Sequence, residues 1–380
     1  MDASKPRPRI GIFTRPIDQG TSGSGHHLLE IVTRLLQRNT EFEFFLIHYE
    51  INDKPLYRLA EEILIPRNPL RASALLRRHD FDLLHYSPLT VYAPVFGLRA
   101  KKVATIHGAE QALVPRYYSP LTVLHEFLVF PHYARGMDHI ITVSQTSSRY
   151  FQTRLGIPGC KISICPNAVS AAYRVLGTGP FAAMRTYGTG ERYFFHLSRY
   201  SERKNPWTML KAFESFLGSG NRGGYRLVLA GSGWDNPRVR KALADRGLRN
   251  QVLLPGFIPE SEVVELLNGA IAFLYPSFAE GFGMPNLEAM ACGCPVITTA
   301  VFAIPEIVGD AALLMRDPRD DQDLARKMEL LASDAGLRRE LIAKGLKQAS
   351  CFSWDRSVET LLDVYRNLLT TEAYAEDPSA

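Results

Sequence analysis

The chain has 380 residues, of which 46% are hydrophobic and 22% are charged, and its formal net charge is +5. This composition is typical of a globular protein and excludes a disordered or fibrous chain, and no apolar run is long enough to predict a membrane-spanning helix. The length favours two domains, because a single hydrophobic core rarely extends over so many residues.

The positive charge is concentrated in the first half of the chain. Residues 1–190 contain 22 basic and 14 acidic residues, whereas residues 191–380 contain 22 and 25. The basic clusters either meet anionic lipid headgroups or an anionic substrate, or form an ordinary solvated surface. They comprise Arg67, Arg71, Arg77, Arg78, Arg99, Lys101 and Lys102. Nucleic acid is not an expected partner, because the excess is modest and no binding motif accompanies it.

The first residues and the cysteines favour a cytosolic protein. MDASKPRPRIGIFTRP lacks the long apolar region and the cleavage site of a secretion signal. Five cysteines without regular spacing do not predict a disulfide framework. Cys292 and Cys294 are either a metal-binding pair or two small buried residues near a helix end. The buried arrangement is favoured, because no second Cys or His pair accompanies them.

Short β-branched and aromatic runs alternate with amphipathic stretches along the whole chain. This alternation predicts parallel sheets covered by helices, and hence an α/β fold in each half. The expected strands are 9–14, 42–48, 82–87, 102–107 and 138–144 in the first half, and 192–197, 225–231, 251–254, 270–275, 295–299 and 311–315 in the second.

Glycine, threonine and proline accumulate at residues 177–190, where the apolar periodicity lapses. We therefore expect an N-terminal domain at 1–180 and a C-terminal domain at 181–355. Residues 356–380 are expected to form a C-terminal helix and tail, with the helix packing back toward the N-terminal domain and its periodic pattern covering 354–371.

Residues 270–299, AIAFLYPSFAEGFGMPNLEAMACGCPVITT, predict a strand, a glycine loop, a helix and a second strand. Pro285 suits a first helical turn and Gly293 a left-handed C-terminal cap. The helix N-terminus then faces the Glu280–Gly283 loop, where free N–H groups and glycines suit a phosphate-bearing, hydroxyl-rich ligand. Glu280 and Glu288 either accept hydrogen bonds from such a ligand or are ordinary solvated acids near a helix start.

The segment EGFGMPNLE followed by AMACGCPVI resembles the E-x7-E signature region of glycosyltransferase family 4, whose members are retaining enzymes of the GT-B fold. The resemblance extends to HLSRYSERKNP, where Arg199 and Lys204 match an Arg and a Lys five positions apart, and to LAGSGW and LPGFIP. Weaker matches in the first half are GTSGSGHH, TIHG, ITVSQTSS and CPNAV. The resemblance implies two Rossmann-like domains whose parallel sheets face each other across a cleft.

The resemblance also implies roles for the residues around the glycine loop. The donor is a nucleotide diphosphate sugar, and fixed positive charge lowers the barrier to departure of its phosphate. Arg199 and Lys204 are the candidates for that charge, with two solvated surface cations as the alternative. The loop is expected to hold the donor sugar through Glu280, Gly281, Phe282 and Gly283, and Glu288 is expected to bind the ribose.

Four further residues are assigned by resemblance to the donor site. The LPGFIP segment is expected to lie against the base, and we assign that contact loosely to Ile258, since main-chain groups would make it. His107, at the end of a strand, is expected to reach the donor sugar or the reacting centre, although it is otherwise an ordinary histidine at a strand end. Gly23 and Gly25 precede a helical pattern and are expected to approach the diphosphate.

Retention implies that no general base activates the acceptor hydroxyl from the opposite face. We expect same-face attack in which the leaving phosphate accepts the proton, with a covalent intermediate on Glu280 as the alternative. No metal cofactor is expected. The D-x-D spelled by Asp80 and Asp82 precedes a strand, which is the wrong end of a parallel strand for a ligand. Asp320, Asp321 and Asp323 indicate a helix start.

The substrates are less defined than the reaction. The RKN segment resembles that of mannosyl- and rhamnosyl-transferring members of the family, and this resemblance favours GDP-mannose as donor. The acceptor is expected to be a glycan, a lipid-linked sugar or a small molecule. Alternatives are a non-catalytic nucleotide-sugar-binding scaffold, and a GT-B phosphorylase or epimerase. Residues 115–133 are apolar and aromatic at helical spacing. They predict either a core helix or peripheral contact with an anionic membrane at its inner face.

Overall fold

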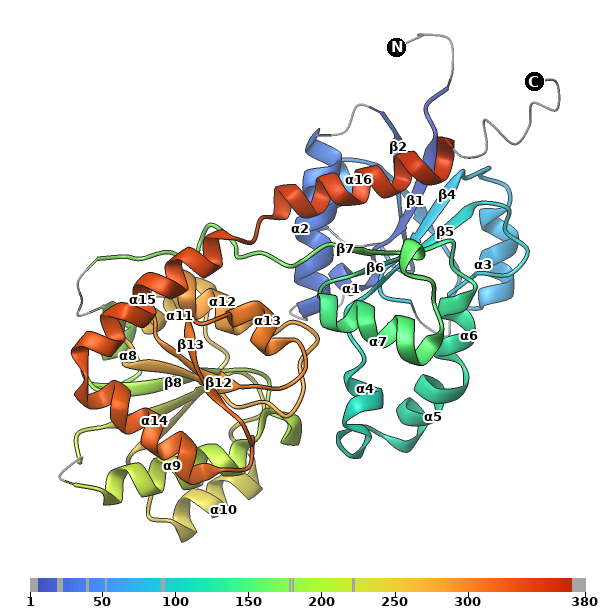
Figure 1. Cartoon of the computed structure of the whole chain (residues 1–380). Coiled ribbons are helices and arrows are strands. Elements are labelled where there is room, and N and C mark those ends of the chain that lie inside the picture. The colour runs from blue at the N-terminus through green and yellow to red at the C-terminus, as the bar shows by residue number, and fades with distance from the viewer. Residues whose placement is uncertain are drawn as a thin grey trace. The chain divides into compact units, whose positions relative to one another are not determined.

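The computed structural model describes residues 6–18, 23–38, 41–51, 53–89, 93–177, 179, 181–220 and 223–370. These residues form two compact units. Unit 1 comprises the described residues up to Asn167 together with those from Ser353 onward, and unit 2 runs from Ala168 to Phe352. Each unit is described by itself below (Figure 1).

Unit 1 is built on a seven-stranded parallel sheet with the strand order β3-β2-β1-β4-β5-β6-β7. Its elements are β1 (Arg9–Phe13), α1 (Arg15–Asp18), α2 (Gly23–Arg38), β2 (Glu43–His48), η1 (Pro55–Arg58), β3 (Glu61–Leu64), α3 (Pro69–Leu76), β4 (Leu83–Tyr86), β5 (Lys101–Ile106), α4 (Glu110–Leu113), η2 (Pro115–Tyr117), α5 (Pro120–Leu128), α6 (Phe130–Arg135), β6 (His139–Thr142), α7 (Gln145–Leu155), η3 (Gly159–Lys161), β7 (Ile162–Ile164) and α16 (Trp354–Thr370).

Unit 2 is built on a six-stranded parallel sheet with the strand order β10-β9-β8-β11-β12-β13. Its elements are α8 (Ala182–Thr186), β8 (Tyr193–Leu197), η4 (Glu202–Lys204), α9 (Pro206–Gly218), β9 (Arg226–Ala230), α10 (Pro237–Asp245), β10 (Val252–Gly256), α11 (Glu260–Gly269), β11 (Ala272–Tyr275), α12 (Met284–Ala291), β12 (Val296–Thr299), α13 (Ile304–Val308), β13 (Ala312–Met315), α14 (Asp321–Ser333) and α15 (Ala335–Ser350).

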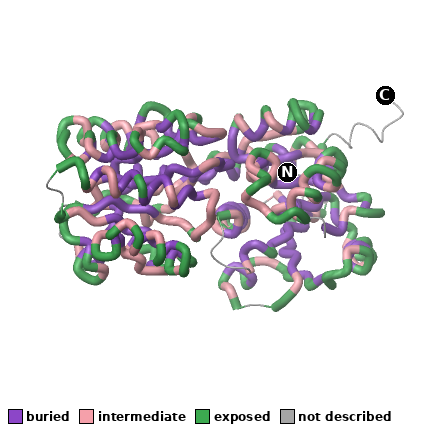
Figure 2. The backbone as a smooth tube through the Cα atoms, turned by 90° about the horizontal axis from the view of Figure 1, so that it is seen from below, coloured by how far each residue is buried: buried purple, intermediate pink, exposed green. Residues whose placement is uncertain are grey.

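The central strands of both sheets are buried along nearly their whole length. Figure 2 shows the buried stretches inside each unit and exposed backbone on its helices and loops. In β4, Leu83 and Leu84 are both buried, and in β8, Phe194 and Phe195 are both buried. Successive strand residues point to opposite faces, so helices cover both faces of these sheets. This confirms the predicted α/β architecture with parallel sheets.

The C-terminal helix α16 packs on unit 1, against α2 and β7 (Figure 1). Its Ser357 hydroxyl donates to the carbonyl of Pro166 at 2.6 Å. Further along α16, the hydroxyl of Tyr365 lies 2.6 Å from Nδ1 of His85 on β4. These buried polar contacts fix the helix on the sheet of unit 1.

All eleven expected strands overlap strands of the structure, and two strands were missed. β3 (EEIL) has one buried residue and pairs only with β2, and β7 (ISI) has three residues and pairs only with β6. Edge strands bury little side-chain area, so their sequences carry weak apolar patterning.

The expected domain boundary at 180/181 lies inside unit 2. The segment before it is already bonded to α11, because the amide of Leu176 donates to Asn268 Oδ1 at 2.8 Å and Nδ2 of Asn268 donates to the carbonyl of Arg174 at 3.0 Å. The glycine-rich stretch shows where the apolar periodicity of the sequence lapses. The boundary between the two units depends instead on which residues contact each other, and it lies between Asn167 and Ala168. No described helix is both long and apolar enough to cross a membrane.

Candidate active site

Several predicted site residues follow two adjacent strands of unit 2. β8 and β11 are paired in parallel, so the segments that follow them leave the sheet at the same edge. Arg199 and Lys204 follow β8, and Glu280 follows β11. The sheet topology therefore brings together two segments that are far apart in the sequence.

Lys204 is held by the backbone conformation around it. It ends the short helix η4, and Asn205 after it has a left-handed φ of 61°, a conformation that Asn tolerates better than most residues. Asn205 Nδ2 donates to the carbonyls of Pro276 and Pro318 at 3.0 and 2.5 Å. Pro206 then occupies the first turn of α9. This turn ties η4 to the end of β11 and leaves Lys204 only 8% exposed.

A buried ionic cluster joins η4 to the glycine loop. Lys204 Nζ donates to Glu280 Oε1 at 2.5 Å and also to the Tyr275 hydroxyl. Nη1 of Arg203 lies 2.7 Å from the same Oε1 and donates to the carbonyl of Ala279. Glu280 is 7% exposed. Two cationic side chains thus share one buried carboxylate.

The charges in this cluster decide its protonation. Burial by itself raises the pKa of Glu280, but Lys204 and then Arg203 outweigh burial, and the pKa lies below its ordinary value. Burial, followed by the charge of Glu280, raises the pKa of Tyr275 well above its ordinary value. At neutral pH the cluster therefore contains an ionised carboxylate and a neutral phenol.

The glycine loop ends at the N-terminus of α12. Gly283 has a φ of 89°, and a Cβ there would lie 2.9 Å from Nδ2 of Asn286, so the position favours glycine. Pro285 lies in the first turn of α12, and Gly293, with a φ of 70°, follows its end. This confirms the predicted helix. Pro285 has no N–H, and the amide of Asn286 donates to the carbonyl of Gly283 at 3.0 Å, so it is chiefly the helix dipole at this end that suits an anion.

Asn286 is a candidate that the sequence analysis missed. Its side chain is fully buried, and neither amide atom has a hydrogen-bond partner among the described residues. Buried amide groups are normally paired, so an unpaired one next to Gly283 needs an explanation. An asparagine in a helix sequence carries no signal of this kind.

Arg199 differs from Lys204 in its surroundings. It is exposed, and within the described residues it makes no ion pair. Its segment is fixed through the backbone, since the amide of Tyr200 donates to Ser232 at 2.9 Å. Gly231 in the LAGSG motif has a φ of 110°, and a Cβ there would lie 2.1 Å from the carbonyl oxygen of Ser198. That glycine is required for the close approach of the two loops.

Glu288 lies in α12 and senses the charge of Glu260, which directly follows the LPGFIP segment. Burial first, and then the charge of Glu260, raises the pKa of Glu288 to about 7. Glu260 begins α11, two residues after Ile258. Ile258 is only 4% exposed, so little of this residue lies at the surface for a base contact, whereas the neighbouring Phe257 is 69% exposed. Phe257 is an aromatic candidate that the sequence analysis missed.

Phe282 and Gly281 complete the loop. Both are buried, and the Phe282 ring packs edge-on against Phe352 with ring centroids 5.6 Å apart. The loop is therefore anchored by an apolar contact as well as by the ion pairs of Glu280.

His107 belongs to unit 1 and directly follows β5. Its Nε2 is buried and has no hydrogen-bond partner in the described part of the chain. Burial lowers the pKa of His107 to about 4, so the ring is neutral at pH 7. The ring packs edge-on against His27 at 4.7 Å, and Nδ1 of His27 lies 2.6 Å from Oδ1 of Asn167. His27 was not predicted, although its place directly after the glycine loop was a usable signal.

Gly23 is the first residue of α2, and Gly25 is buried in its first turn. A Cβ on Gly23 would meet no atom of the described residues within 4 Å. Residues 20–22 of the predicted glycine loop lie outside the described residues.

The residues interpreted as structural have structural partners. Asp82 Oδ2 accepts from the amide of Arg9 at 2.7 Å, at the beginning of β1 and β4. Asp320 caps α14 by accepting from the amide of Asp323 at 2.8 Å. Cys292 and Cys294 are free, buried thiols. Asp82 of the D-x-D therefore bonds to the backbone at a strand start, and Asp320 of the acidic group caps a helix, as the sequence analysis expected.

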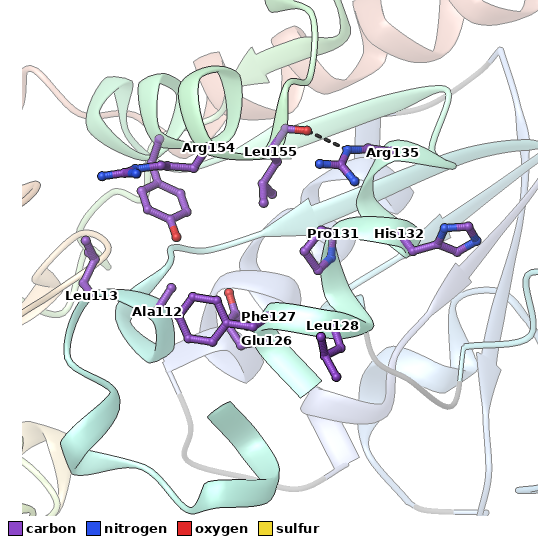
Figure 3. A pocket seen from close by; sticks show the side chains of 11 residues that line it. Ala112, Leu113, Glu126, Phe127, Leu128, Pro131, His132, Arg135, Arg154 and Leu155 are labelled. Carbon is purple, nitrogen blue, oxygen red and sulfur yellow. Dashed lines mark hydrogen bonds between the residues drawn. The ribbon is translucent and has the colours of Figure 1, made fainter. Parts of the chain in front are cut away.

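A pocket of about 810 Å³ lies in unit 1 between α4, α5, α6 and α7 (Figure 3). α5 has no buried residue, so residues 120–128 are not a core helix, whereas Phe130 at the start of α6 is buried in the core of unit 1. The exposed side chains of α5 are Leu121 (78%), Leu124 (55%), Phe127 (54%) and Leu128 (68%). The pocket is lined by Phe127 and Leu128 together with the basic residues Arg135 and Arg154.

Comparisons with known proteins cover most of the chain. Residues 185–348 match the family model "Glycosyl transferases group 1", and residues 21–173 match "Glycosyltransferase Family 4". O-antigen chain mannosyltransferase B from Escherichia coli is 30% identical over 95% of this chain and 100% of its own length. D-inositol 3-phosphate glycosyltransferase from Salinispora arenicola is 26% identical, over 95% of this chain and 92% of that protein.

Solved structures share the fold at low sequence identity. Sucrose-phosphate synthase from Thermosynechococcus elongatus superposes with a TM-score of 0.76 at 18% identity, covering 96% of this chain and all of that one. HepE from Anabaena, solved with UDP and glucose, gives 0.76 at 19% identity over 95% of this chain and all of that one. The chain therefore has the GT-B fold, as the motifs predicted.

Proposed function

Because the chain belongs to glycosyltransferase family 4, we propose that it is a retaining, metal-independent enzyme that transfers a hexose from a nucleotide diphosphate sugar to an acceptor hydroxyl. The observation that carries the proposal is the buried cluster of Arg203, Lys204 and Glu280 beside the start of α12. Its charges are placed before any ligand binds, as stabilisation of a leaving phosphate requires.

The leaving diphosphate is proposed to bind where Arg199, Lys204 and the N-terminal end of the α12 dipole supply positive potential. Negative charge develops on the phosphate oxygen as the glycosidic bond breaks, so fixed positive groups lower the barrier. Arg199 has no competing carboxylate among the described residues, which leaves its guanidinium available for bidentate contact. Glu280 is proposed to hold the sugar, and Glu288 the ribose.

Retention is proposed to proceed by same-face attack, with the leaving phosphate accepting the proton of the acceptor hydroxyl. A covalent intermediate on Glu280 is disfavoured. Arg203 and Lys204 both contact its Oε1, and charge pairing of this kind makes a carboxylate a weaker nucleophile. His107 is proposed to contact the donor sugar or the reacting centre, and its neutral ring suits hydrogen bonding to hydroxyl groups.

Metal independence is proposed because protein groups supply the charge that a divalent cation would otherwise contribute. Asp80 and Asp82 do not compete for this role, since Asp82 is bonded to the backbone at the beginning of β1.

The first donor to test is GDP-mannose, because a relative with full-length coverage is described as an O-antigen chain mannosyltransferase. HepE, solved with UDP-glucose, makes a uridine donor the next choice. A panel of nucleotide sugars tested by thermal shift and by release of nucleoside diphosphate examines the proposal. We expect one donor to raise the unfolding midpoint and to be consumed. Binding without release for every donor would favour a non-catalytic scaffold.

The acceptor is proposed to be a glycan or a lipid-linked sugar, received by a cytosolic enzyme at the inner membrane face. The exposed apolar residues of α5 and the exposed Arg71, Arg77 and Arg78 support peripheral contact with anionic lipid. Sedimentation with anionic vesicles at low and high salt tests this contact. Absence of binding at low salt would favour a soluble acceptor.

A further inference from the structure

Arg203 lies beside the motif lysine but is not part of the Arg199 and Lys204 pair. The structure gives it three links to the glycine loop. Its Nη1 lies 2.7 Å from Glu280 Oε1, and it donates to the carbonyl of Ala279. Its own carbonyl accepts from the amide of Phe278 at 3.0 Å. Backbone and side chain thus both bind η4 to the loop that carries Glu280.

The charge of the cluster depends on this arginine. Lys204 and Glu280 alone form a buried pair whose formal charges cancel. A pair with no net charge attracts a diphosphate only weakly. The attraction between its two charges serves mainly to offset the free energy that both lost when they were removed from water. The second cation leaves the cluster with one net positive charge. The Arg203 side chain is 20% exposed, so this charge is largely shielded from solvent.

We propose that Arg203 is a positioning residue for the transfer reaction: it compensates the charge of Glu280, so that Lys204 keeps its attraction for the donor diphosphate, and it fixes the loop at Ala279 and Glu280. The inference rests on the proposed function, because it concerns the same diphosphate. It assigns to Arg203 no contact with the ligand.

The test compares Arg203→Gln, Arg203→Lys and a matched control, Arg238→Gln. Arg238 is 70% exposed and pairs with Glu202, the neighbour of Arg203, at 2.9 Å. Calorimetry measures binding of GDP, GMP, UDP and UMP to each protein, and circular dichroism checks folding. For the diphosphate that binds the wild type, Arg203→Gln should weaken binding about tenfold. The monophosphate should lose much less, and Arg203→Lys should recover most of the affinity. Arg238→Gln should match the wild type.

A second pair of variants tests whether Arg203 acts through Glu280. In a Glu280→Gln background no carboxylate needs compensation, so adding Arg203→Gln should cost less than about threefold. The same tenfold loss in both backgrounds would mean that Arg203 contacts the ligand itself, which would overturn the positioning role. Wild-type affinity in a folded Arg203→Gln protein would also overturn it, while leaving the proposed function intact. Failure of the wild type to bind either diphosphate would overturn both.

Discussion

Lys204→Met and Arg199→Met form the most informative pair of substitutions, because the two cations have the same proposed ligand but different surroundings. Lys204 is 8% exposed and contacts Glu280 and Tyr275, whereas Arg199 is exposed. Methionine preserves the apolar stem of each side chain, so the loss of charge dominates. Each variant should lose at least about a hundredfold in turnover, since removing one preformed charge from a developing oxyanion costs about 3 kcal/mol.

Stability should separate the two variants. Removing one partner of a buried ion pair typically costs about 3–5 kcal/mol, because it leaves a buried charge uncompensated. Arg203 remains on Glu280 in the Lys204 variant, so we expect about 3 kcal/mol of lost stability. Arg199 has no ion-pair partner among the described residues, and its replacement should change the free energy of unfolding by less than about 0.5 kcal/mol.

The pH dependence provides an internal check. The folded-state pKa of Glu280 is lowered, so its contribution to stability is present above its unfolded value and is lost as pH falls through the folded pKa. Without Lys204 that pKa rises, so the deficit of the variant should shrink as pH falls below the ordinary carboxyl value of 4.5. Urea denaturation at pH 7 and at pH 4 measures this. Equal stability of the Lys204 and Arg199 variants, or a deficit independent of pH, would refute the buried ion pair.

Three further predictions concern other parts of the molecule. Asn286→Leu should stabilise the protein by about 1–2 kcal/mol in urea denaturation, because it removes a buried unpaired amide, and an unchanged or lower stability would show that the amide is paired. Glu288→Gln should be about 2 kcal/mol more stable than wild type at pH 8 and equal to it near pH 4.5. The pKa of Glu288 is raised to about 7, so the wild-type protein loses stability as pH rises toward that value, whereas the glutamine variant does not. Equal unfolding curves of the two proteins at both pH values would contradict the assignment. Leu124→Gln with Leu128→Gln should abolish sedimentation with anionic vesicles and leave the unfolding midpoint unchanged, whereas retained sedimentation would exclude α5 as the contact.

The positions of most strands in each unit follow from features visible in the sequence, and the missed strands show the limits of those features. Buried strands such as YFFHL in β8 have apolar side chains on both faces, which makes them recognisable in the sequence. β3 and β7 lie at sheet edges and have one and no buried residues, so patterning does not reveal them. The helix after the glycine loop was predictable because Pro285 and Gly293 mark its ends by local conformational preference.

The sequence predicted which types of residue form the candidate site, but not which residues form ion pairs with one another. The motif spacing marked Arg199, Lys204 and Glu280. It gave no indication that Lys204 pairs with Glu280, or that Arg199 is exposed and makes no ion pair with any residue the structure describes. Those differences arise from contacts between segments more than 70 positions apart in sequence. Arg203 was missed for the same reason, since in the sequence it is indistinguishable from a solvated cation before a helix.

The central claim is that this protein transfers a sugar from a nucleotide diphosphate donor with retention and without a metal. The direct measurement is proton NMR of the anomeric signal during turnover of GDP-mannose, or of whichever nucleotide sugar the panel identifies, in the presence of a chelator. The account predicts that nucleoside diphosphate is released with chelator present and that the first sugar product has the anomeric configuration of the donor. An inverted first product, or release that occurs only after a divalent metal is restored, would contradict it.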